Sequence, residues 1–137
     1  MKLVFSIVII FMFLIGNAQE KSQLIVDFEL VKYKSGKLYV AVYNTEESFL
    51  KEAMTGIIVE INNGKATATF DNLKYGTYAV SSFYDKNDNG KLDTDFLGIP
   101  KEPTAMSNNA KGSFGPPKFK DAKFIFSSNK NTIKINF

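Results

Sequence analysis

The sequence contains no cysteine, histidine, arginine or tryptophan, so every basic side chain is a lysine. Without histidine and cysteine, the chain lacks the usual general base, the thiol nucleophile and the ligands that soft metals prefer. Without arginine, it lacks the planar group that binds phosphate through two parallel hydrogen bonds. Without cysteine, it can form no disulfide and carries no thiol that could accept a lipid. These absences exclude most of the familiar active-site chemistries.

The formal net charge of the 137-residue chain is +3, and its lysines are spread along the chain with acidic residues between them. A nucleic-acid-binding protein would concentrate its basic residues on one segment or face. We therefore expect no nucleic-acid partner.

The N-terminus has the features of a secretory signal peptide over residues 1–18. Lys2 precedes an apolar run that is shorter than the roughly 20 residues needed to cross a bilayer. Gly16 and Ala18 then supply the small residues of a cleavage site. We expect a secreted or periplasmic protein of residues 19–137 that has no membrane span after cleavage, forms one domain and is monomeric.

Runs of alternating apolar and polar residues, separated by turn residues, recur along the mature chain and predict strands. This pattern predicts an all-β fold, a single seven-stranded antiparallel β-sandwich of immunoglobulin-like or prealbumin-like type with one long ordered loop. The runs are residues 24–31, 37–44, 57–61, 65–70, 71–84 (a turn and a strand), 122–128 and 131–137.

Two pairs of runs predict hairpins. Ser35 and Gly36 lie between the runs 24–31 and 37–44, and an Asn-Gly pair follows the run 57–61. Asn-Gly between alternating runs is the strongest short-range hairpin signal. Residues 44–54 are the one candidate for a short helix, since Thr45 can cap its first turn.

Residues 85–120 contain no credible strand, although they include several large apolar residues. A connection of this length is either functional or disordered. The apolar residues favour an ordered loop that packs on the rest of the domain. All four prolines lie in it, namely Pro100, Pro103, Pro116 and Pro117.

The loop opens with DKNDNGKLD, which has the spacing of a calcium-binding loop. Short oxygen-bearing side chains occupy alternate positions, and Gly90 stands at the sixth, where the backbone turns sharply. Phe96 occupies the twelfth position, where a bidentate glutamate is expected, so binding would be weak. The alternative is a polar turn, since Asp, Asn and Gly all favour turns. The candidate ligands are Asp85, Asn87, Asn89, Lys91 (through its carbonyl), Asp93, Asp95 and Glu102.

The segment LKYGTY, residues 73–78, resembles the corner at which a sandwich strand begins, where a tyrosine hydroxyl bonds back to upstream backbone. We therefore expect Tyr78 to be buried near the start of its strand. The alternative is an ordinary core aromatic after a turn.

These motifs together resemble an exported bacterial family known as domain of unknown function 2141. The shared motifs are Gly-Thr-Tyr, Asp-x-Asn-x-Asn-Gly-x-x-Asp, Gly-Ile-Pro-x-Glu and Phe-Gly-Pro-Pro-x-Phe, and the resemblance covers residues 36–126. The loop is also similar to that of calcium-bearing B-type repeats of surface adhesins. In those repeats a glutamate stands where this chain has Phe96.

Three functions stay open from the sequence. The first is a non-catalytic binding or accessory module that contacts a protein or glycan at the cell envelope. The second is a purely structural module, which burial of Phe114 and Phe119 would favour. The third is a glycoside hydrolase built on two of the carboxylates Asp85, Asp93, Asp95 and Glu102. The first would use exposed contact residues, for which the candidates are Met106, Ser107, Asn108, Asn109 and Phe114.

Overall fold

A computed structural model describes residues 22–137, and the expected signal peptide lies outside this range. The described chain is all-β, as predicted, with one 3₁₀ turn and one short helix. Within it no helix combines the length and the apolar character that crossing a bilayer requires. The elements are β1 (Gln23–Glu29), β2 (Ser35–Tyr43), β3 (Thr55–Asn62), β4 (Lys65–Asp71), β5 (Gly76–Asp85), β6 (Thr104–Met106), η1 (Ser107–Asn109), α1 (Phe119–Ala122), β7 (Phe124–Phe126) and β8 (Thr132–Asn136).

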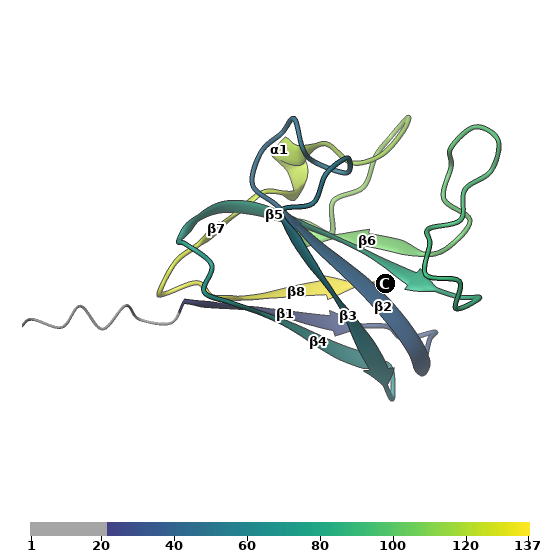
Figure 1. Ribbon diagram of the computed structural model, residues 1–137, viewed down its shortest axis with the longest axis horizontal. Helices are drawn as coiled ribbons and strands as arrows, with labels where there is room; N and C mark the ends of the chain where they lie inside the picture. The colour runs from purple at the N-terminus through teal and green to yellow at the C-terminus, as the bar shows by residue number, and fades with distance from the viewer. Residues whose placement is uncertain (1–21) are drawn as a thin grey trace, which may run out of the picture.

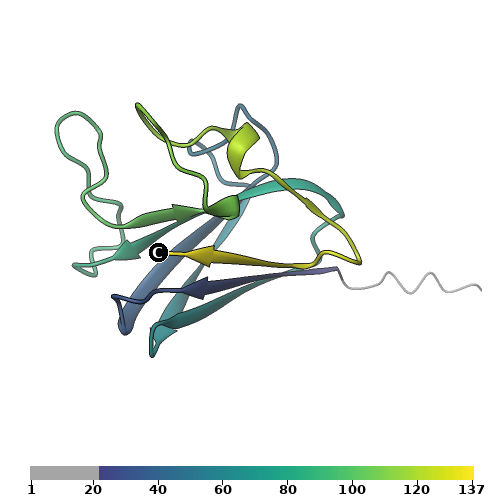
Figure 2. The ribbon, with the colours of Figure 1, turned by 180° about the vertical axis from the view of Figure 1, so that it is seen from behind.

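The strands form one sheet in the order β6-β5-β2-β3-β4-β1-β8, with β7 paired to the start of β5 (Figures 1 and 2). All of its neighbours are antiparallel except β1 and β8. The sheet is nearly barrel-shaped, because the amide of Asn136 at one end of the path donates to the side chain of Asn109, next to β6. A separate two-layer sandwich is therefore not confirmed.

The sheet is pinched between β3 and β4. These strands pair at one position, Asn62 with Lys65, whereas β3 pairs with β2 along its length and β4 pairs with β1. The pinch divides the sheet into a four-strand half, β6-β5-β2-β3, and a three-strand half, β4-β1-β8. The inner faces of the two halves enclose the main core, so the four-strand half also has an outer face.

The predicted Asn-Gly hairpin is confirmed, and the other predicted hairpin is wrong. Asn63 and Gly64 both have positive φ, 49° and 78°, as a two-residue hairpin turn requires. In contrast, β1 pairs with β4 and β8, and β2 pairs with β3 and β5. The chain crosses from one half to the other between β1 and β2, where Gly64 accepts from the Leu30 amide and donates to the Lys34 carbonyl. Alternation shows that a strand has a buried face, but it does not identify the partner.

Two other expectations need correction. Residues 44–54 form turns and no helix, and the segment 85–120 contains the strand β6. β6 pairs with β5, with Met106 opposite Ser81. A three-residue strand is too short to produce an alternating pattern, so periodicity cannot predict it.

The core follows the alternation in the strands. In β2, Leu38, Val40 and Val42 point inward, and in β1 Leu24, Val26 and Phe28 do the same. The expectation for Tyr78 is confirmed: the ring is buried, and its hydroxyl donates to the Lys74 carbonyl at 2.5 Å. Burial raises the pKa of this phenol.

We predict that Tyr78→Phe lowers the free energy of unfolding by about 1 kcal/mol, because it removes one hydrogen bond and keeps the ring. Tyr78→Ala should cost about 3–5 kcal/mol, since it also leaves a cavity. Urea denaturation followed by circular dichroism measures both losses. Tyr75→Phe is the matched control, because Tyr75 is 47% exposed. Equal losses for Tyr75→Phe and Tyr78→Phe would contradict a structural role for the Tyr78 hydroxyl.

Candidate functional site

The outer face of the four-strand half carries a row of small residues. Strand register places Gly56 of β3 opposite Ala41 of β2, and Ala41 opposite Ser81 of β5. The neighbouring row is bulky, since Tyr39 stacks on Phe83 with ring centroids 4.8 Å apart. Small side chains beside large ones hollow the surface of the sheet at this row.

Two loops rise beside this hollow. The first arm, residues 86–103, joins β5 to β6, and the second arm, residues 110–118, joins η1 to α1 (Figure 1). A second apolar cluster, with Tyr43, Phe49 and Met106 among its buried members, packs on the same outer face near the second arm. The arms therefore stand on a packed base.

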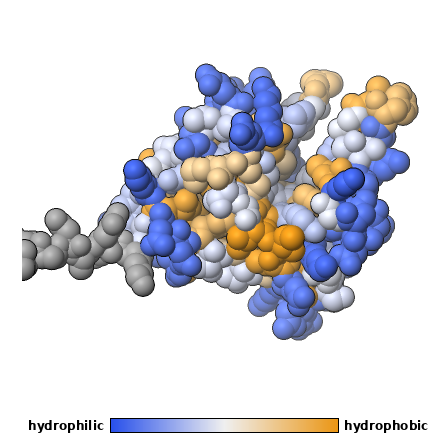
Figure 3. Space-filling view, in the orientation of Figure 1, coloured by the Kyte–Doolittle hydropathy of each residue, from blue (hydrophilic) through white to orange (hydrophobic). Residues whose placement is uncertain are grey.

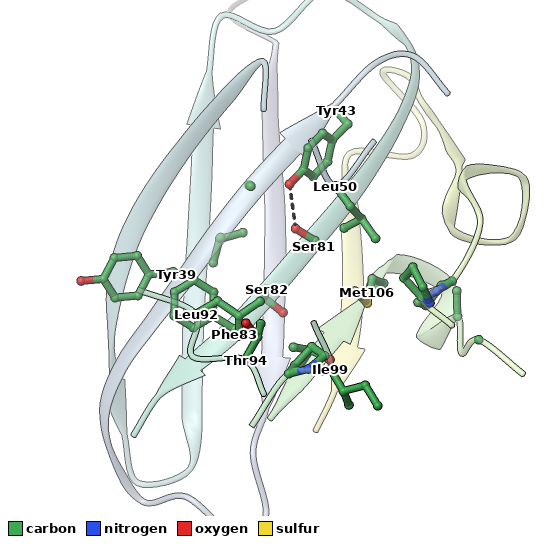
Figure 4. A pocket seen from close by; sticks show the side chains of 18 of the residues that line it. Tyr39, Tyr43, Leu50, Ser81, Ser82, Phe83, Leu92, Thr94, Ile99 and Met106 are labelled. Atoms are coloured by element: carbon green, nitrogen blue, oxygen red, sulfur yellow. Dashed lines mark hydrogen bonds between the residues drawn. The ribbon is translucent and has the colours of Figure 1, made fainter. Parts of the chain in front are cut away.

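The hollow and the two arms enclose an open cleft of about 1280 Å³. Its floor comes from β2, β3 and β5, and its walls come from the two arms (Figure 4). The lining is mostly apolar and includes Tyr39, Ala41, Tyr43, Leu50, Gly56, Ile57, Ile58, Ser81, Phe83, Leu92, Leu97, Ile99, Pro100, Met106, Lys111, Phe114, Pro116 and Pro117.

Polar groups in the cleft are few. The Tyr43 hydroxyl lies 3.2 Å from the Ser81 hydroxyl across the floor, as Figure 4 shows. Among the described lining residues there is no carboxylate, and Lys111 is the one charged side chain. The cleft is therefore suited to an apolar ligand, with one cation available for an anionic group.

At the base of the first arm, two buried carboxylates hold the backbone. Asp85 accepts from the amides of Asn89 and Gly90 at 3.2 and 2.9 Å. Glu102 accepts from the amides of Lys86 and Asp93 at 2.9 and 3.1 Å. Asp85 is 4% exposed and Glu102 is 6% exposed, so both charges are stabilised by amides instead of water.

Between these carboxylates, the predicted metal ligands bond to one another. The side-chain amides of Asn87 and Asn89 donate to the Asp93 carboxylate at 2.7 to 3.0 Å. Lys91 contributes its amide, which donates to the Asn89 side chain at 3.0 Å. The structure thus brings Asp85, Asn87, Asn89 and Asp93 together in one compact turn.

Asp95 lies apart from that turn, at the tip of the arm. Its carboxylate accepts from the amides of Leu97 and Ile99 at 2.8 and 3.0 Å. Within residues 22–137, no three acidic, histidine or cysteine side chains gather as a metal-binding group. Hydrogen bonds to the backbone therefore account for Asp95 and Glu102, which were expected as replacement ligands.

The expected contact residues are divided by the structure. Met106 and Ser107 are buried, which corrects the expectation that they are exposed. The Ser107 hydroxyl links β5 to α1, since it accepts from the Val80 amide at 2.9 Å and donates to the Ala122 carbonyl at 2.5 Å. Asn108 and Asn109 are exposed, but their side chains bond to nearby backbone. Phe114 is fully exposed, which disfavours the purely structural module.

The sequence contained a signal for the cleft that alternation alone missed. Residues 38–43 of β2 are apolar without interruption, LYVAVY. A strand covered on both faces has such a continuous run. The outward residues of this run are therefore predictable as part of a second apolar surface, and they are Tyr39, Ala41 and Tyr43.

Residues 26–134 match a family described as uncharacterised protein conserved in bacteria, DUF2141. No curated protein and no solved structure matches the chain. The likeness to calcium-bearing adhesin repeats is thus not shown.

We predict that Glu102→Ala loosens the first arm, because it leaves two amides without their charged acceptor. The free energy of unfolding should fall by about 2 kcal/mol or more. Hydrogen exchange should accelerate at the amides of Lys86 and Asp93 and change little in β1. Asp88→Ala is the control, because the Asp88 side chain is 69% exposed and pairs with Lys37 at the surface. Unchanged exchange at both amides in Glu102→Ala would contradict the bracing role of Glu102.

Proposed function

The chain belongs to the DUF2141 family of bacterial proteins, and we propose that it is a non-catalytic binding domain of the cell envelope whose apolar cleft holds its ligand. The observation that carries this proposal is the cleft between the two arms. Its volume, about 1280 Å³, exceeds the roughly 300–1,000 Å³ of a site for a drug-sized molecule. The ligand is then a larger apolar molecule or an apolar segment of a partner.

The shape of the scaffold supports this proposal. The two halves of the sheet face each other across the core, and we infer that the scaffold is a relative of the prealbumin-like or immunoglobulin-like sandwiches, with four strands and three strands in its layers. Such scaffolds commonly carry their binding sites on loops. Export to the envelope, which places the domain in the periplasm or outside the cell, is supported by the sequence features of residues 1–18.

The placement of the carboxylates supports binding over hydrolysis. A glycosidase needs two carboxyl groups facing one cleft. Here Asp85 and Glu102 are buried and occupied by backbone amides, and the described lining of the cleft contains no carboxylate. A sugar bound in the cleft would meet no carboxyl group of the described lining that could act as the acid or the nucleophile of a glycosidase.

We predict that an apolar fluorophore such as anilinonaphthalene sulfonate binds the folded protein saturably. Ala41→Leu should weaken this binding about tenfold, because it fills the floor of the cleft. Thr69→Leu, at an outward position of β4 in the other half, should leave the affinity unchanged. Lys111→Ala should weaken the anionic fluorophore more than a neutral one. Equal affinity in Ala41→Leu and Thr69→Leu would contradict binding in the cleft.

We further propose that the turn in the first arm binds calcium weakly, and one arrangement supports this second proposal. Rotating a side-chain amide by 180° exchanges its nitrogen and oxygen. In Asn87 and Asn89 this rotation would turn two oxygens toward Asp93, where the nitrogens now lie. These oxygens, the Asp93 carboxylate and the Lys91 carbonyl would then supply hard ligands of the kind that calcium prefers. The Asp85 carboxylate would join them through its remaining lone pairs, because each of its oxygens already accepts one amide, from Asn89 or from Gly90.

We predict a calcium dissociation constant of about 10⁻⁴ to 10⁻³ M, because Asp95 and Glu102 are committed to amides and Phe96 replaces the bidentate ligand. Ten times that concentration should stabilise the fold by about 1.4 kcal/mol and raise its Tm by roughly 5 °C. Thermal melting in calcium, in magnesium and in chelator measures this, and magnesium should do much less. Asp93→Asn should reduce the shift, whereas Asp121→Asn, in α1, should keep it. Identical melting in calcium and in chelator would contradict the proposal.

A further inference from the structure

The tips of both arms present large apolar side chains to solvent. Phe96 is 94% exposed and Leu97 is 69% exposed at the tip of the first arm, and Phe114 is 106% exposed at the tip of the second arm. Figure 3 shows both tips as separate apolar projections at the upper right of the molecule. Exposed apolar groups on this scale, rimmed by polar residues, mark an interaction surface.

The backbone of the first tip is built to hold its side chains outward. The Asp95 carboxylate accepts from the amides of Leu97 and Ile99, and the Asp95 amide donates to the Ile99 carbonyl at 2.9 Å. Gly98 turns the chain with φ of 79°. These bonds close residues 95–99 into a tight turn, and the one carboxylate in it is used internally. The tip therefore offers apolar side chains and little free negative charge.

The second tip is held by a close approach of its backbone and by two prolines. A Cβ atom on Gly112 would collide with the carbonyl of Gly115, so the two sides of the arm touch at a narrow neck. Gly115 has φ of 144°, in a region that favours glycine. Pro116 and Pro117 follow directly and stiffen the chain. Phe114 lies beyond the neck, where the chain reverses, and it projects into solvent.

Lysines flank the second tip. Residues 110–118 contain Lys111 and Lys118 and no acidic residue, and Lys120 and Lys123 follow in and after α1, with Asp121 between them. The first arm is mixed in charge, since its three lysines stand among four acidic residues. Three of these carboxylates, Asp93, Asp95 and Glu102, are bonded within the arm, and Asp88 pairs with Lys37. The surface next to the second tip is thus cationic.

We propose that the two arms dock the protein on the surface of an anionic phospholipid bilayer, with Phe96 and Phe114 inserted among the acyl chains and the neighbouring lysines at the headgroups. Apolar insertion and lysine attraction to anionic lipid are additive contributions to binding at such a surface. The charge on the second arm selects this partner over a neutral apolar protein surface. Docking goes beyond the cleft function, and it would place the mouth of the cleft against lipid.

The test is sedimentation of the protein with vesicles of phosphatidylcholine alone and of phosphatidylcholine mixed with phosphatidylglycerol. We expect binding to the mixed vesicles and much weaker binding to the neutral ones. Phe96→Ser and Phe114→Ser should each weaken binding about tenfold or more, because each removes one buried ring. Ile125→Ser is the matched control, because Ile125 is 64% exposed and β7 lies at the other end of the molecule from the arms (Figure 1).

Charge variants test the lysines separately. Lys111→Ala and Lys118→Ala should each weaken binding to the mixed vesicles about fivefold. Lys134→Ala, on β8 in the three-strand half, should have little effect. Added salt should weaken binding in the same way as the lysine variants.

A tryptophan reporter tests insertion directly, because the chain contains no tryptophan. The emission of Phe96→Trp should shift to shorter wavelength when mixed vesicles are added, and brominated acyl chains should quench it. The emission of Ile125→Trp should stay unchanged.

Three results would overturn the proposal. The first is that the protein does not bind the mixed vesicles, and the second is that Phe96→Ser binds them as tightly as the wild type. The third is self-association that depends on Phe96 without vesicle binding. That result would make the tips an interface between copies of this chain. Failure here is distinguishable from failure of the cleft function. Phe96 does not line the cleft, so Phe96→Ser should still bind the apolar fluorophore, and Ala41→Leu should still bind vesicles.

Discussion

The junction between β3 and β4 determines where every other surface of this protein can lie. Gly64 bonds through its amide to Lys34 and through its carbonyl to Leu30, so the turn of this hairpin is fixed to the crossing between β1 and β2. A Cβ atom at Gly64 would stand 2.9 Å from the Leu30 carbonyl, so the approach depends on glycine. Because β3 and β4 pair at one position there, the sheet turns its two halves face to face. The core then lies between the halves, and the outer face of the four-strand half is left for the second apolar cluster and the cleft.

The sequence predicted local features of this fold and missed the non-local ones. The Asn-Gly turn and the corner at Tyr78 depend on a few adjacent residues, and both are present. The partner of β1 depends on contacts with Ala66 and Ile135, far along the chain, and no local pattern carries that information. The same limit applies to β6, which needs the edge of β5 to exist.

The candidate site shows why residue spacing alone is ambiguous. Alternating Asp and Asn residues around a glycine can collect oxygens around a cation, or they can accept amides from a sharply turning backbone. Here Asp85 and Glu102 satisfy backbone amides at the base of the first arm, and Asp95 does so at its tip. The sequence therefore identified the segment, whereas the structure was needed to show which of its carboxylates accept backbone amides. Alternation does not predict the cleft, because its floor lies at outward strand positions, which alternation places in solvent.

Rigidity and apolar exposure occur together in the two arms, and this combination separates them from ordinary surface loops. A loose loop could bury the ring of Phe96 or Phe114 against the other apolar residues of the cleft, since burying such a ring is worth about 1.5–3 kcal/mol. The Asp95 hydrogen bonds and the neck at Gly112 oppose that collapse, so the backbone conformation of each arm holds its ring exposed. Rings held outward in advance lose less conformational freedom when they meet a partner. The same backbone devices that keep the cleft open therefore keep the tips ready for contact, and one architecture serves both proposed surfaces.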